Sequence, residues 1–139
     1  MLDTPVNAAL VMAIFVAGIV RFVIGGIWYS KWCFQKTWMK LSGVKESDMK
    51  KDPLRPMLVE LLAGFFMAYV LALVVRHTAA RNVVGGMEIG FLVWVGFVAT
   101  VTIGAVVFEK KSFRWFALLN GFQLVSMLAM GAILAIWPQ

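Results

Sequence analysis

The sequence is poor in the residues that build soluble domains and reactive sites. Only 14% of its 139 residues are charged, against about a quarter in a soluble domain, and 62% are hydrophobic. This excludes a soluble fold, whose surface needs more polar residues. The single cysteine, Cys33, excludes an intramolecular disulfide, and with one histidine, His77, the chain lacks the ligands of a zinc site. We therefore expect no metal and no cofactor.

Four apolar stretches are each long enough to cross a bilayer, which takes about 20 helical residues. They run from about Val6 to Tyr29, Met57 to Val75, Val83 to Phe108 and Phe113 to Trp137. The first lacks the basic flank of a signal peptide, so we interpret it as a retained span. Helices satisfy their own backbone hydrogen bonds in lipid, and short connections favour antiparallel neighbours. The predicted fold is all-α, with one domain over residues 1–139 that forms an integral membrane bundle of four antiparallel transmembrane helices.

The only sizeable polar segment is the connection between the first two spans, residues 30–56. Within it, residues 31–41 predict a short amphipathic helix at the membrane interface, with Phe34 and Trp38 on one face and Lys36 on another. Aromatic side chains of the kind that anchor helices at membrane interfaces cluster nearby. They are Trp28, Tyr29, Trp32 and Trp38.

Lysine and arginine are divided unequally between the two sides of the predicted bundle. Only Arg76 and Arg81 fall on one side, whereas ten basic residues fall on the other. The positive-inside rule then places residues 30–56 and 109–112 in the cytoplasm and both termini outside. Because the basic residues adjoin apolar spans, the net charge of +6 favours anionic lipid headgroups over nucleic acid as the partner. The ten are Lys31, Lys36, Lys40, Lys45, Lys50, Lys51, Arg55, Lys110, Lys111 and Arg114.

Arg21 and Glu60 are charged residues within the predicted spans. Each interrupts a stripe of small residues at every fourth position, which lets helix backbones approach closely, and each lies near the cytoplasmic end of its helix. An unpaired charge in a bilayer costs at least about 2.5–3.5 kcal/mol, and in an antiparallel helix pair these two side chains could come within reach, where pairing would be the least costly arrangement. Two interpretations stay open. The pair fixes helix register, or Arg21 snorkels to the headgroups; alternatively, the two residues line an anion or headgroup pocket, or a proton path.

Glu88 lies near the outer end of the third span, beside the turn that carries Arg76 and Arg81. We expect an outer-side ion pair among these three residues. A stripe at every fourth position continues from Glu88 and could line a cavity or form a packing seam between helices. It consists of Leu92, Gly96, Thr100 and Gly104.

Asn120 and Gln123 are three residues apart in the fourth span, so they share a helix face. Amides in lipid need partners, and we expect both to point into the bundle or into an oligomer interface. They act either as interhelical hydrogen-bonding groups or as a pair that coordinates a substrate. Thr100 and Thr102 are expected to add buried polar groups, although a threonine hydroxyl can also bond to its own helix.

Several motifs resemble a family of bacterial membrane proteins known as domain of unknown function 1761 (DUF1761). The resemblance covers most of the chain in order, and it implies four spans, a bacterial inner membrane and periplasmic termini; it implies no activity. The matching elements are Gly25-Gly26-Ile27-Trp28-Tyr29-Ser30, then Phe34, Lys36, Trp38, Met39 and Gly43, then Ala68–Ala72, Trp94–Val98, Asn120-Gly121 and Ser126–Leu134.

The sequence contains no recognisable catalytic constellation, so we expect no enzyme. Four helices enclose little volume, and the first hypothesis is therefore a small transporter or channel built as a homo-oligomer. The alternative is a non-catalytic protein that binds lipid or assists a partner complex, which the lysine-rich loop and its tryptophans favour. A third hypothesis, an enzyme acting on a lipid at the cytoplasmic interface, would have to use Glu60, Tyr29 and Arg21.

Overall fold

The computed structural model describes residues 5–138, a range that contains helices and no strand. Four helical segments are long and apolar enough to cross a membrane. They are α1 (Ala8–Trp28), α4 (Leu54–His77), the continuous segment Val83–Phe108, and α7 (Phe113–Ile136). The all-α class and the four membrane-length helices are confirmed. The predicted domain also includes residues 1–4 and 139, which lie outside the described residues.

Three of the long helices are capped at their N-terminus by a short polar side chain. Asn7 accepts a hydrogen bond from the backbone N–H of Leu10 at 2.8 Å at the start of α1. Asn82 accepts one from Gly85 N–H at 2.8 Å at the start of the third segment, and Ser112 caps α7 in the same way. Each cap satisfies one of the free N–H groups that every helix start leaves open, so the bounds follow from local sequence.

Two short helices occupy the connection between α1 and α4. Helix α2 (Gln35–Ser42) ends at Gly43, whose φ of +74° suits glycine, and α3 (Glu46–Lys51) follows. The helix predicted over residues 31–41 therefore begins later than expected. Residues before Gln35 form turns instead, in which Phe34 N–H donates to the carbonyl of Trp28.

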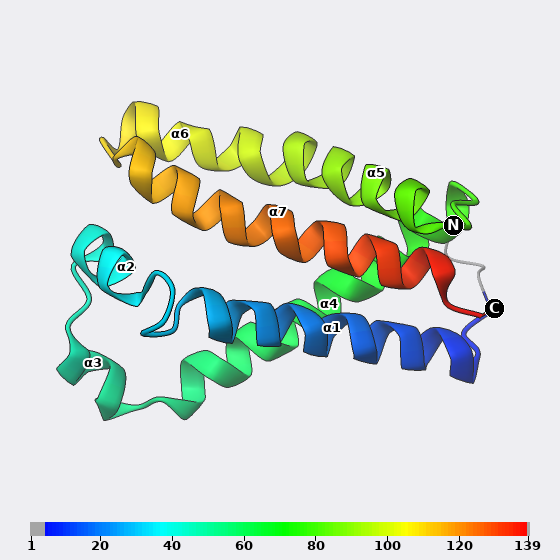
Figure 1. The fold of residues 1–139 in the computed structure, drawn as a ribbon, viewed down its shortest axis with the longest axis horizontal. Helices are drawn as coiled ribbons and strands as arrows, with labels where there is room; N and C mark the ends of the chain where they lie inside the picture. The colour runs from blue at the N-terminus through cyan, green and yellow to red at the C-terminus, as the bar shows by residue number, and fades with distance from the viewer. Residues whose placement is uncertain (1–4, 139) are drawn as a thin grey trace.

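The long helices lie side by side, and Figure 1 shows the chain reversing direction from each to the next. Helix α1 packs on α4 and α7, while the Val83–Phe108 segment lies along α7. We call the end where α1 begins and α7 ends the terminal end. The opposite end, which carries α2, α3 and the 109–112 connection, is the basic end. There the first turns of α4 and α7 lie apart, on opposite sides of α1 (Figure 1).

The third long segment is interrupted by a π-helix. It consists of α5 (Val83–Val93), the π-helix η1 (Trp94–Ala99) and α6 (Thr100–Phe108). Residues four apart in an α-helix are offset by about 40° around the helix axis, so a stripe at every fourth position winds around the helix. The wider turns of a π-helix offset such residues in the opposite sense and cancel part of this winding. Gly96 in η1 and Gly104 in α6 consequently both face open space, with no neighbouring atom within 4 Å of an added Cβ. The stripe that starts at Glu88 therefore runs along the outer surface.

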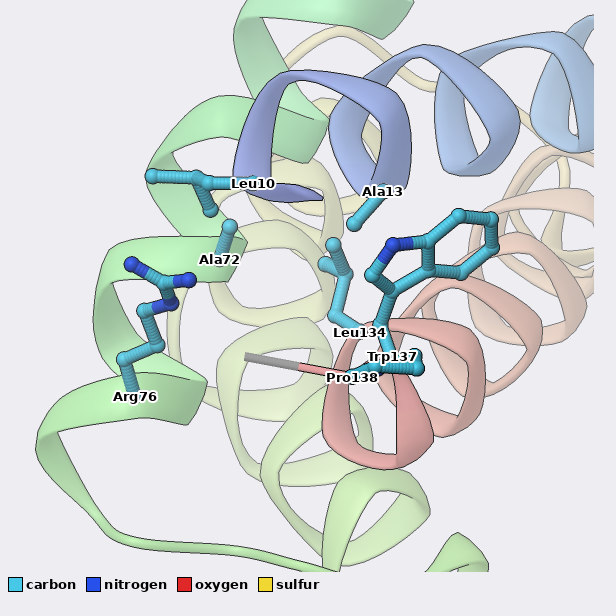
Figure 2. Close-up of a pocket in the computed structure, with 7 residues that line it drawn as sticks. All are labelled: Leu10, Ala13, Ala72, Arg76, Leu134, Trp137 and Pro138. Atoms are coloured by element: carbon cyan, nitrogen blue, oxygen red, sulfur yellow. The ribbon is translucent and has the colours of Figure 1, made fainter. Parts of the chain in front are cut away.

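The main core cluster lies in the terminal half of the bundle, where alanines alternate with larger leucine, valine and methionine side chains. Ala13 and Ala17 of α1 meet Ala68 and Ala72 of α4, and all four are at most 3% exposed. Such residues let helices approach closely in lipid. The space left between α1, α4 and the end of α7 is a pocket of about 10 Å³ (Figure 2), room for about one water. The interior between these three helices is therefore closed in the terminal half.

Gly86 and Gly131 bring α5 and α7 into backbone contact. A Cβ added at Gly86 would overlap the carbonyl oxygen of Gly131, and one added at Gly131 would overlap that of Gly86. Gly90 makes an equally close approach to the carbonyl of Met127. Only glycine fits at such contacts, and they fix the third segment against α7.

A polar cavity at the basic end

A cavity of about 480 Å³ opens at the basic end, between α1, α4 and α7. This volume lies within the range of small-molecule sites. Arg21, Tyr29, Glu60 and Gln123 supply its polar groups, and apolar or aromatic side chains make up most of the rest of the wall. We call it the basic-end cavity.

Both short helices contribute to the wall of this cavity. Trp38 of α2 and Met49 of α3 line it, although both lie in the connection outside the spans. The Tyr29 ring, at the end of α1, meets the Trp38 ring edge-on at a centroid distance of 5.7 Å and the Phe122 ring at 5.5 Å. These contacts attach the 30–53 connection to the bundle, so the loop is a structural part of the cavity.

The structure brings Arg21 and Glu60 together at the base of the cavity. Arg21 Nη1 donates to Glu60 Oε1 at 2.5 Å. Arg21 is 3% exposed, whereas the Glu60 side chain is 50% exposed. The guanidinium also lies 5.0 Å from the Phe122 ring centroid, a cation–π distance. Gly64 lies beside the arginine, and a Cβ there would make an ordinary van der Waals contact with Arg21 Cδ at 3.6 Å. The cation is thus deep, and the carboxylate faces the opening.

Two polar atoms of cavity-lining residues have no partner. Arg21 Nε, a donor, and Gln123 Oε1, an acceptor, are both buried and make no hydrogen bond within residues 5–138. A buried polar group without a partner costs about 1–3 kcal/mol. Both atoms are covered by protein atoms, so the cost falls on the wall of the cavity and not on its open space.

Asn120 and Gln123 have different surroundings and do not act as a pair. Asn120 is 3% exposed, and its Nδ2 donates to Thr102 Oγ1 on α6 at 2.9 Å. Gln123 instead lines the cavity. Thr100, predicted to be buried, is exposed, and its hydroxyl donates to the carbonyl of Gly96 in its own helix at 2.7 Å. The π-helix rotates Thr100 to the outer surface.

The structure does not bring Glu88 together with Arg76 or Arg81. Glu88 and Arg81 are exposed, and Arg76 borders the small terminal-end pocket, where Figure 2 shows its guanidinium beside Ala72. Over residues 5–138 the ion pairs present are Arg21–Glu60, Lys50–Glu46 and Lys51–Asp48. The predicted outer-side pair does not form, because Glu88 lies on the outward stripe of α5.

The four predicted aromatic anchors divide into three roles. Tyr29 and Trp38 line the cavity. Trp28 joins α1 to α7, because its Nε1 donates to the carbonyl of Leu118 at 3.1 Å and its ring packs against Gly121. Trp32 is 93% exposed, which leaves it free to meet a surrounding medium. Sequence reasoning missed Phe122, which resembles its apolar neighbours, and Met49, a single apolar residue in the charged segment of α3.

The Asn120–Thr102 hydrogen bond is expected to contribute a small coupling between α6 and α7. In a double-mutant cycle of Asn120→Leu and Thr102→Val, the coupling free energy should be about 0.6 kcal/mol and below about 1.7, as for other interhelical bonds in membranes. Unfolding in mixed micelles measures it. Thr100→Val is the matched control, and an equal coupling of Asn120 to Thr100 would contradict the assignment.

Together, the four long apolar helices and the short amphipathic connection define a multi-pass helical membrane protein. The chain belongs to the DUF1761 family, described as proteins of unknown function, and the family model covers residues 12–135. The family expected from the sequence motifs is confirmed. Neither the curated proteins nor the solved structures contain a match to the chain.

Proposed function

We propose that this protein is a non-catalytic lipid-binding protein of the bacterial inner membrane, which holds a lipid headgroup in the basic-end cavity. The observation that carries the proposal is Arg21. It is 3% exposed and lines a cavity of about 480 Å³. A guanidinium in the wall of such a space suits a phosphate oxygen, the acceptor that guanidinium groups bind most strongly in lipids.

The position of the opening supports a lipid as the occupant. Cavity-lining residues are exposed where α1 and α4 meet: Gly26 faces open space, and Met57 and the Glu60 side chain are each 50% exposed. An opening between two spans faces the bilayer, so acyl chains can stay in the membrane while the headgroup enters. The positive-inside rule would place this end at the cytoplasmic leaflet, with both termini periplasmic, the four spans antiparallel and α2 on the membrane surface.

The closed terminal half favours binding over transport through one chain. A path across the bundle would have to pass Ala13, Ala17, Ala68 and Ala72, all at most 3% exposed. The homo-oligomeric transporter expected first from the sequence would need a route between subunits. The residues that a lipid-modifying enzyme would use do line one cavity, but Glu60 Oε1 already accepts a hydrogen bond from Arg21.

A cavity-filling variant tests lipid binding. Gly26 lines the cavity and has no atom within 4 Å of an added Cβ, so Gly26→Phe should fill the space without a clash inside the bundle. We expect native mass spectrometry of the detergent-purified wild type to show retained phospholipid. The variant should retain less, by about tenfold or more, which corresponds to about 1.4 kcal/mol.

Gly96→Phe is the matched control for this experiment. Gly96 also faces open space on a long helical segment, but it lies outside the basic-end cavity. Its variant should retain lipid as the wild type does. A wild-type protein that carries no phospholipid, or equal retention by the Gly26 and Gly96 variants, would contradict the proposed function.

A further inference from the structure

We propose that the protein associates with a second copy of itself through the outer face of α5, where Glu88 of each copy pairs with Arg81 of the other. This contact lies at the terminal end, away from the basic-end cavity, and it does not depend on lipid binding. Three features support it: the groove that surrounds Glu88, the position of Arg81, and the common orientation of copies in one membrane.

Glu88 lies in an apolar groove on the outer face of the third long segment. Glu88 is exposed, and it takes part in no ion pair within residues 5–138. Acyl chains can cover exposed apolar side chains, but ionisable residues within spans almost always face protein or a water-filled space. The carboxylate is therefore the group that calls for a protein partner. The groove has a volume of about 570 Å³, and the rest of its wall consists of Val84, Met87, Phe91, Leu92 and Leu128.

The depth of Glu88 in the membrane strengthens this requirement. Glu88 lies five residues beyond Val83, where α5 begins, which is about 8 Å along the helix. The continuous segment Val83–Phe108 has 26 residues, or about 39 Å, against about 30 Å for the hydrocarbon core. A centred segment would place Glu88 just inside the edge of the hydrocarbon. Water reaches a carboxylate poorly there, so a cation from a neighbouring protein is the favourable partner.

Arg81 is the cation that a second copy can bring to this groove. The sequence places two arginines at the terminal end, Arg76 and Arg81. Arg76 borders the small pocket of its own chain (Figure 2). Arg81 is exposed in the connection that leads into α5, and it has no ion partner in the described part of the chain. The distribution of lysine and arginine would insert every copy in the same orientation, so Arg81 of one copy lies just beyond the depth of Glu88 in the other.

A two-fold axis along the membrane normal makes two such ion pairs at once. A surface that carries an acid and a base is self-complementary in a two-fold contact, because each residue meets its counterpart in both directions. Arg81 and Glu88 are seven residues apart in the sequence. The two ion pairs therefore cross midway between them, near Val84, which lines the groove and is 65% exposed. The Val84 side chains of the two copies should consequently lie next to each other.

Disulfide crosslinking in membrane vesicles tests this contact. The full-length chain carries Cys33→Ser together with either Val84→Cys or Val11→Cys, and copper phenanthroline is the oxidant. Val11 provides the matched control, because it is a valine near the same end, on α1, and is 51% exposed. We expect Val84→Cys to give a crosslinked dimer on non-reducing electrophoresis, since a disulfide needs Cα atoms within about 7 Å of each other. Val11→Cys should give only the level of random collision.

Charge reversal tests the ion pairs themselves. In the chain that carries Val84→Cys, Glu88→Arg alone and Arg81→Glu alone should each lower the crosslinked fraction by at least about tenfold, because like charges then face each other. Coexpression of the two variants with different tags should restore crosslinking between unlike copies, because both ion pairs form again. An ion pair within one chain would not give this rescue.

The comparison of Val84 with Val11 decides the proposal even if a charge variant fails to insert. Equal crosslinking at the two positions, or a different membrane protein crosslinked at Val84 in place of a second copy, would overturn it. Unchanged crosslinking in the charge variants, or a loss that coexpression does not rescue, would overturn the Glu88–Arg81 pairing. Lipid retention is measured separately, so none of these outcomes bears on the proposed function.

Discussion

Replacing Gly86 with alanine is expected to lower the free energy of unfolding of the bundle by about 1–3 kcal/mol, and replacing it with valine by more. The new Cβ would overlap the carbonyl oxygen of Gly131 and lie 2.7 Å from the Ala135 Cβ. Neither the Gly131 carbonyl nor the Ala135 methyl group can rotate out of the way, so α5 would have to move away from α7. The free energy of unfolding falls because the contacts between these two helices are lost.

Gly104→Ala is the matched control for this variant. Gly104 lies in the same long segment, and no atom lies within 4 Å of an added Cβ. Alanine favours a helix over glycine by about 1 kcal/mol, so this variant should be as stable as the wild type or more stable. Unfolding by sodium dodecyl sulfate in mixed micelles, followed by far-ultraviolet circular dichroism, measures both. Equal losses in the two variants would show that the α5–α7 backbone contact is not what holds the segment.

Removing Glu60 is expected to be more costly than removing its partner Arg21. Glu60→Met leaves a 3%-exposed cation without its carboxylate, and we expect a loss of about 2–3 kcal/mol. Breaking a fully buried pair costs about 3–5 kcal/mol, and the lower figure reflects the 50% exposure of the Glu60 side chain. Arg21→Met should cost less, because the remaining carboxylate can turn to the headgroup region.

The double variant Arg21→Met/Glu60→Met separates charge pairing from packing. Hydrophobic side chains of similar size in place of both partners are often neutral or stabilising, so the double variant should be more stable than Glu60→Met alone. The exposed pair Glu46–Lys50 provides a control, since Glu46→Met should change stability by less than about 1 kcal/mol. A double variant whose loss equals the sum of the two single losses would contradict a direct interaction.

The sequence predicted the four long helices because the thickness of a bilayer sets the length of an apolar run. It also indicated that Arg21 and Glu60 could come within reach of each other, without deciding whether they pair, and the structure places Arg21 Nη1 2.5 Å from Glu60 Oε1. That prediction was accessible because each residue lies in a four-residue stripe of small side chains, which indicates the packed faces of α1 and α4. A charge on such a face has few partners within reach.

Hydropathy could not reveal which face of a span meets lipid and which meets protein. The third span has the same mean hydropathy as α1 and α4, yet none of its most apolar stretch is buried, against about a third of that in α4. The placement of Glu88 and Thr100 was missed for this reason, and the π-helix that precedes Thr100 has no clear signature in the sequence. Trp38 and Met49 reach the cavity through tertiary contacts of the loop, which local sequence does not specify.

The taper of the bundle bears on how a ligand enters and leaves. The helices are in backbone contact at the terminal end and diverge at the basic end, so the two halves can respond to ligand independently. Under the proposed function, a headgroup would enter and leave at the basic end while the alanine and glycine contacts of the terminal half stay packed. The permeability barrier of the membrane would then not have to open for the ligand to exchange.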